Sequence, residues 1–171
     1  MSEMGRQADT QRKRPQWVES GHSLVSSGKR SLQAATVERS SIVVRSVWAA
    51  CLLIAGLNHA RLLVQHGLFW DYGGLNPISA LYQTSLTLLD PLVAASLFLR
   101  PKAGIVATIF LIVTNVIHNV ATIAHHAPTD EFLARVSHPI TLSQVGFMLF
   151  VLGTARMAWH GAKRSGPRSV R

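Results

Sequence analysis

Polar side chains recur inside the most apolar stretches of this chain, and their spacing follows the period of an α-helix. At about 100° per residue, Asn115, His118 and Asn119 fall on one face, and Gln83 and Asp90 share a face of a second stretch. Polar groups in hydrocarbon are costly unless they face protein or water, so these faces should meet inside a bundle of helices. The predicted interior polar site consists of Asn58, His59, Arg61, Gln83, Asp90, Asn115, His118, Asn119 and Gln144.

Asp90-Pro91 is the sharpest single feature of this site. An Asp near the centre of a bilayer costs about 3 kcal/mol on the insertion scale, so it is usually paired or functional. Pro91 removes a helical hydrogen bond and frees the carbonyl of Thr87 beside the acid. Two interpretations stay open: a protonated Asp90 that only bonds a neighbouring helix, and a group that handles protons. We expect Asp90, Asn115 and His118 to form one polar network, because a short link makes their helices antiparallel neighbours.

The histidines are also unevenly distributed, and most of them lie in the outer half or at the outer rim of the predicted bundle. The spacing from His59 to His66 equals that from His118 to His125, so two stacked pairs could form between parallel helices. Such pairs suit bis-imidazole haem or a divalent metal. The same spacing is simply two helical turns, so structural histidines are the other interpretation. We therefore assign no metal and no cofactor, and keep haem b or a quinone as the alternative.

The composition requires membrane helices to position these residues. Hydrophobic residues make up 48% of the 171-residue chain and charged residues 15%, against roughly 25% charged in a soluble domain. Four apolar stretches near the roughly 20 residues needed to cross a bilayer cover about 46–64, 77–99, 103–125 and 139–158. Asn76-Pro77 and His138-Pro139 mark two helix starts. The predicted fold class is all-α: a polytopic membrane protein with a four-transmembrane-helix bundle at residues 42–160.

The distribution of Lys and Arg predicts the orientation of this bundle. Cationic loops stay on the cytoplasmic side, and the cations before residue 46, at 100–102 and after 162 share one side only if the number of crossings is even. This rule supports counting the first stretch, whose apolar core ends early at Leu57. We expect both termini in the cytoplasm and the helices in a bacterial-type cytoplasmic (inner) membrane. Residues 1–41 and 161–171 are expected to be basic tails, the first of them disordered.

The rest of the sequence excludes several classes of function. The one cysteine, Cys51, rules out an intrachain disulfide and any multi-cysteine metal site. No Walker loop, dinucleotide-binding glycine run, HExxH motif or nucleophile elbow is present. The net charge of +9 favours anionic lipid headgroups over nucleic acid, because the cations flank apolar stretches and lack interleaved aromatic residues. Four helices enclose little space, so a homo-oligomer or a partner membrane protein is a further expected partner.

The polar interior leaves two functional classes beside a structural one. Hydrogen bonding between helices would by itself explain the polar faces. If they form a site, the favoured function is binding or passage of a small solute or a proton in the outer half of the bundle, by a protein that is not an enzyme. The alternative is a membrane redox component that binds haem or a quinone through the outer histidines. At the outer rim, Arg61 is expected to meet Asp71.

The orientation can be tested with topology reporters. Fusions after Lys102 and Lys163 should report a cytoplasmic location, and fusions near Gly74 and Asp130 an external one, because positively charged loops are retained inside. Parallel fusions to alkaline phosphatase and to a fluorescent protein give the readout, since each is active on only one side. An external C-terminus would contradict the four-crossing bundle.

Overall fold

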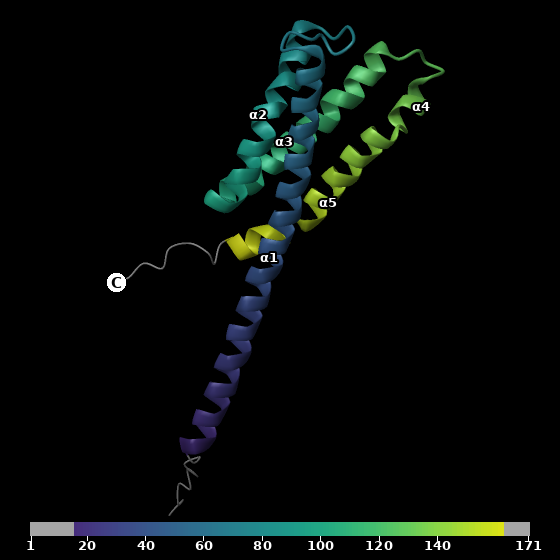
Figure 1. Ribbon diagram of the computed structural model, residues 1–171. Helices are drawn as coiled ribbons and strands as arrows, with labels where there is room; N and C mark the ends of the chain where they lie inside the picture. Colours follow the sequence, from purple (N-terminus) through teal and green to yellow (C-terminus); the bar gives the residue numbers. More distant parts are fainter. Residues whose placement is uncertain (1–15, 163–171) are drawn as a thin grey trace, which may run out of the picture. The chain divides into compact units, whose positions relative to one another are not determined.

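The computed structural model of the protein describes residues 16–162, and all regular secondary structure in this part is helical (Figure 1). The helices are α1 (Gln16–His66), α2 (Pro77–Leu99), α3 (Pro101–His126), α4 (Phe132–Val136) and α5 (Pro139–Ala162). The chain divides into two units, of which the first ends at Thr36 and the second begins at Val37, so α1 runs through both. The second unit holds the rest of α1 and all other helices, and it is described below by itself.

α1 begins at Gln16, whereas the sequence predicted a disordered tail over residues 1–41 and a helix only from about residue 46. The structure thus differs from the expected tail at residues 16–41, while residues 1–15 and 163–171 lie outside the described part. No proline interrupts the segment between Pro15 and the apolar stretch, and a helix that has already nucleated extends at little cost. The missing apolar periodicity removes a packing face but does not prevent a helix.

The other three predicted helices are present. α2 has the predicted bounds, α3 begins at Pro101 rather than at about residue 103, and α5 ends at Ala162 rather than at about residue 158. Asn76 caps α2, because its Oδ1 accepts a hydrogen bond from the Ser79 amide at 3.0 Å. The short helix α4 lies in the link between α3 and α5 and was not expected.

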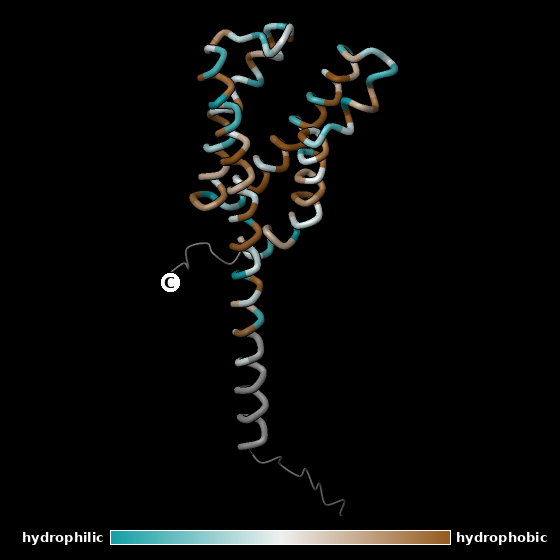
Figure 2. Tube along the Cα trace, turned by 45° about the vertical axis from the view of Figure 1, so that its right-hand side comes forward, coloured by the Kyte–Doolittle hydropathy of each residue, from teal (hydrophilic) through white to brown (hydrophobic). Residues whose placement is uncertain are grey.

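Among the described residues, three helices are long and apolar enough to cross a membrane: Ser31–His66 within α1, then α3 and α5. Figure 2 shows their apolar residues in brown and the polar positions between them in teal. α2 is also long, at 23 residues, but Gln83, Thr87 and Asp90 make its middle more polar. Membrane-capable helices are therefore confirmed, while the fourth crossing and the orientation of the termini stay predictions.

Within the second unit, α3 contacts both α2 and α5, and α1 is joined to α5 by side-chain hydrogen bonds. The fully buried Trp48 donates from Nε1 to Thr154 Oγ1 at 3.2 Å. Earlier on α1, before the apolar stretch, Ser41 Oγ donates to the carbonyl of Ala158 at 2.7 Å. These bonds hold α1 along the last turns of α5.

Arg45 joins α1 to the end of α2 in the same region. The residue is only 4% exposed, and its Nη1 donates to the carbonyl of Leu97 at 2.9 Å. Leu97 lies in the last turn of α2, where carbonyls lack helical partners and carry the negative end of the helix dipole. The sequence predicted Arg45 as one of the cytoplasmic cations, and the structure adds that this residue is buried against a helix end.

α2 and α3 approach closely at Gly104, just after the link between them. A Cβ at Gly104 would lie 2.5 Å from the backbone nitrogen of Leu97, which is too short without movement of the backbone. Gly104→Ala should therefore lower the free energy of unfolding by about 1–3 kcal/mol, the usual cost of overpacking a close-packed site. The measurement is the midpoint of thermal unfolding in detergent.

Gly146 on α5 provides the matched control, since a Cβ there would meet no atom within 4 Å. Gly146→Ala should be neutral or slightly stabilising, because Ala is the better helix former. Equal midpoints for wild type and Gly104→Ala would show that α2 and α3 are not in close contact at this point.

Candidate functional site

A pocket of about 450 Å³ opens among α1, α2, α3 and α5 within the second unit. Each of these helices contributes a polar side chain to its lining: Asn58 and His59 from α1, Asp90 from α2, Asn115 from α3 and Gln144 from α5. Pockets of roughly 300–1,000 Å³ with mostly apolar walls and a few placed polar groups are typical of small-molecule sites. The structure thus brings several of the predicted site residues around one space.

Gln83, Asn119 and Gln144 form a chain of side-chain amides that joins three helices. Gln83 Nε2 on α2 donates to Asn119 Oδ1 on α3 at 2.8 Å. Asn119 Nδ2 in turn donates to Gln144 Oε1 on α5 at 2.8 Å, and it approaches Asn115 Oδ1 at 3.4 Å. Because Gln144 and Asn115 also line the pocket, this amide network fixes two of its polar groups.

Asp90 lies on the pocket wall and is only 4% exposed. α1 approaches α2 closely here: a Cβ added at Gly56 would lie 3.3 Å from Asp90 Cβ and 3.1 Å from Pro91 Cδ. Within the described residues, no hydrogen bond or ion pair reaches the Asp90 carboxyl. Buried polar groups are nearly always bonded, so an acid that borders an open space is a mark of a functional site.

The expected single network of Asp90, Asn115 and His118 is divided in the structure. Asp90 and Asn115 share the pocket, but His118 lies outside its lining and packs against Tyr82, with ring centroids 4.6 Å apart. The reason is the helical period: His118 and Asn119 point about 100° apart, so only one of them can face α5.

In the described part, four buried side-chain atoms have no hydrogen-bond partner: His59 Nδ1, Tyr82 Oη, Thr87 Oγ1 and His118 Nε2.

The outer histidines make other ring contacts than the predicted pairs. His66 stacks on Trp70 with ring centroids 4.0 Å apart, and His125 packs edge-on against His126 at 4.8 Å. His59 does line the pocket. Among the side chains that the structure describes, no group of three or more His, Cys, Asp or Glu is placed to hold a metal ion.

Arg61 is exposed and does not line the pocket. Asp71, its expected partner, instead accepts a hydrogen bond from the Gly73 amide at 3.1 Å, which closes a turn in the loop after α1. A salt bridge between other described residues joins Arg135 to Glu131 at 2.8 Å. The predicted Arg61–Asp71 ion pair is therefore wrong for the described residues: Asp71 takes part in a local turn, and no salt bridge joins it to Arg61.

Cys51 and Ser143 also line the pocket, although neither was among the predicted site residues. Both carried a usable signal, since Cys51 precedes Asn58 by two helical turns and Ser143 is adjacent to Gln144. Small side chains in an apolar stretch are usually packing residues, which hides such positions from pattern analysis.

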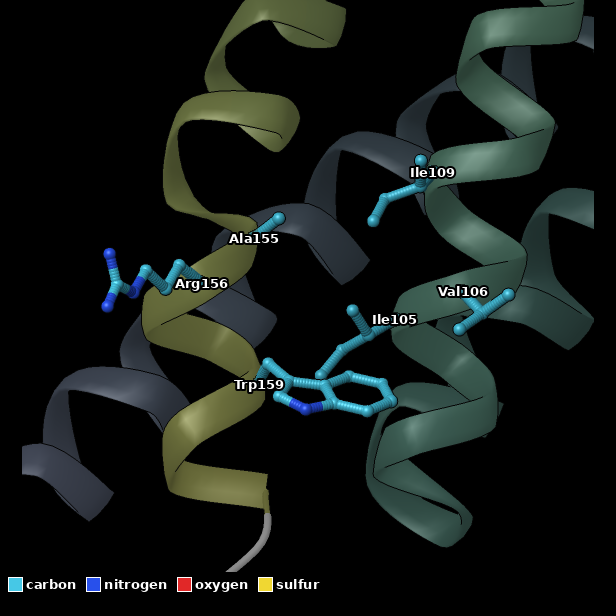
Figure 3. Close-up of a pocket in the computed structure, with 6 residues that line it drawn as sticks. All are labelled: Ile105, Val106, Ile109, Ala155, Arg156 and Trp159. Carbon is cyan, nitrogen blue, oxygen red and sulfur yellow. The ribbon is translucent and has the colours of Figure 1, made fainter.

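A second depression, of about 310 Å³, lies between α3 and α5. Figure 3 shows the Trp159 indole directed toward α3 beside Ile105, whereas the Arg156 guanidinium points away from α3. The lining residues of this depression are all described and include no acid, histidine or nucleophile. It therefore offers no acid-base chemistry, and the polar pocket is the candidate site.

Fold and pocket together define a class, a helical protein with membrane-capable helices and a pocket among them that has polar groups in its lining. No protein-family model, curated protein or solved structure matches the chain.

The amide network predicts a specific loss of stability. Asn119→Leu should lower the free energy of unfolding by about 1–3 kcal/mol for each partner amide that it leaves unsatisfied. Asn115→Leu is the matched control on the same helix and should cost less, because the Asn115 bond is long at 3.4 Å. Thermal unfolding in detergent measures both variants. If Asn119→Leu is as stable as wild type, the network does not hold the helices together.

Proposed function

We propose that this protein is an integral protein of the cytoplasmic (inner) membrane with four crossings and both termini inside, and that its pocket binds a small solute or passes a proton. The one-sided distribution of Lys and Arg supports the orientation, and these cations would contact anionic lipid headgroups. The 23 residues of α2 extend about 35 Å at 1.5 Å per residue, enough for a hydrocarbon core of about 30 Å. A second copy or a partner membrane protein would complete the enclosure of the pocket.

The placement of Asp90 is the observation that supports solute binding or proton passage. It lies in the interior of α2, is buried on the pocket wall, and is surrounded by polar side chains from three other helices. A carboxyl at such depth costs several kcal/mol unless its charge is neutralised. If Asp90 served only to bond neighbouring helices, a hydrogen-bond donor should lie beside its carboxyl, as a donor and an acceptor lie beside the Asn119 amide. Asp90 borders a space instead.

The polar residues then have different roles. Asn119 and Gln83 bind helices to one another. Asp90 is the group that takes up and releases a proton, because it is the carboxyl in the lining of the pocket. Asn58 and Gln144 present neutral amide dipoles that can hydrogen-bond a solute without adding charge.

The haem or quinone alternative has weaker support in the arrangement of the histidines. It rests on His59, His66, His118 and His125, and of these the pocket lining contains His59. His118 packs against Tyr82, and the other two stack with neighbouring rings.

Proton passage can be tested in liposomes that enclose a pH-sensitive dye. With the membrane potential clamped by potassium and valinomycin, wild-type protein should accelerate the decay of an imposed pH gradient. Asp90→Asn keeps the shape of the side chain but cannot exchange a proton, so it should lose at least about tenfold of the protein-dependent rate.

Asp130→Asn is the matched control, because Asp130 is an exposed acid in the link between α3 and α5. It should leave the rate unchanged. A rate for Asp90→Asn equal to that of wild type would contradict a proton-carrying role of Asp90, and a wild-type rate equal to that of empty liposomes would contradict proton passage altogether.

A further inference from the structure

The ionisable side chains that line the polar pocket are not balanced in charge. Its lining contains the carboxyl of Asp90 but, in the part of the chain that the structure describes, neither Lys nor Arg. The nearest buried cation on α1, Arg45, is bound to the carbonyl of Leu97, about 10 Å further along α2 at 1.5 Å per residue. Arg61 is exposed and outside the lining. An ionised Asp90 would therefore have no counter-ion from the protein within the pocket.

An isolated carboxylate in a site of low dielectric constant takes up a proton or binds a cation, because it cannot stay charged alone. The amides of Asn58, Asn115 and Gln144 can hydrogen-bond either form, but they carry no charge that could neutralise it. Two states of the pocket are thus balanced electrically: a protonated Asp90, and an ionised Asp90 with a bound cation.

The remaining walls decide what kind of cation fits. Leu52, Leu111 and Ile112 line the pocket with aliphatic surface, and Phe147 adds an aromatic ring, which attracts a cation over its face. A hydrated metal ion would gain nothing from such walls. An ammonium group on an apolar body would use both the acid and the apolar surface, and a volume of about 450 Å³ admits a small aromatic amine.

We propose that this pocket binds a small organic cation, an ammonium group with an apolar and preferably aromatic body, whose charge pairs with Asp90 and displaces its proton. The inference rests on the proposed function, because it uses the same pocket and the same acid. For a quaternary ammonium ligand the step is balanced simply: the O–H bond of the Asp90 carboxylic acid breaks, an ion pair forms, and one proton leaves to water. No oxidant or second reactant is needed.

Other titratable groups surround Asp90 and are part of the test. His59 and Cys51 from α1 line the same pocket, and Tyr82 lies about two turns before Asp90 on α2. α3 and α5 line it with amides, the Ser143 hydroxyl and apolar groups. The proton released must therefore be assigned by a variant, and the carboxyl-to-amide exchange at Asp90 makes that assignment.

The probe is benzyltrimethylammonium, which carries a permanent charge and no proton of its own. Titration calorimetry of the full chain in detergent, repeated in buffers of different ionisation enthalpy, should show about one proton released per bound cation. Where Asp90 is protonated in the empty pocket, the affinity should rise about tenfold per pH unit, because one proton is exchanged. Phenylacetate, an anion of similar size, should not bind.

Asp90→Asn should bind the cation at least about tenfold more weakly and release no proton, whereas Asp130→Asn should behave as wild type. If Asp90→Asn does not fold, wild type is compared with His59→Gln and Cys51→Ser: proton release that persists in both variants belongs to Asp90, and its loss in either overturns the inference. An affinity independent of pH, binding of phenylacetate equal to that of the cation, or no binding of the cation would each overturn the inference.

The result is separable from that of the proton-passage test. Cation binding with proton release in a protein that passes no protons in liposomes would keep this inference and overturn proton passage. Proton passage without cation binding would do the reverse.

Discussion

Asn119 accepts a hydrogen bond from α2 and donates one to α5, and hydrocarbon would offer its side-chain amide neither. A polar group in an apolar helix can therefore be satisfied only by another helix, which makes the direction of each polar face a constraint on packing. The amide of Asn119 has both a donor and an acceptor, so it can join two neighbours at once. The positions of α2 and α5 around α3, and with them the polar walls of the pocket, depend on this arrangement.

A second set of polar contacts holds the other end of the same helices. Arg45 binds the carbonyl of Leu97 on α2, and Ser41 binds the carbonyl of Ala158 on α5, both from α1. Along α2, Gln83, Asp90 and Leu97 follow one another at intervals of two helical turns. The first and the last of these three positions are bonded to neighbouring helices, and the middle one borders the pocket.

The polar residues of these helices are therefore of two kinds: those bonded to a neighbouring helix, and Asp90, which borders the pocket. Gln83 and Asn119 are bonded at 2.8 Å and act as links between helices. Asp90 is buried to a similar degree as the surrounding core but faces a space lined by neutral dipoles. We propose that in such surroundings its charge state changes with the occupant of the pocket, which would couple a proton to a solute.

The sequence by itself determined the helices and the faces on which polar residues lie. The bounds of α2, its start at Asn76-Pro77 and the interior placement of the polar faces that carry Gln83, Asn119 and Gln144 follow from helical periodicity and from the cost of polar groups in hydrocarbon. It did not determine the start of α1, because a nucleated helix can extend through a polar segment without any packing face.

Only the tertiary structure decided which partner each polar side chain meets. It buried Arg45 at a helix end, turned His118 toward Tyr82, left Arg61 exposed, and placed Cys51 and Ser143 in the pocket. The physical reason is that periodicity fixes a direction on one helix to within about 100°, the angle between consecutive residues. The group that lies in that direction depends on how closely neighbouring helices approach, as α1 approaches α2 where Gly56 lies against Pro91. Such an approach exists only in the packed structure.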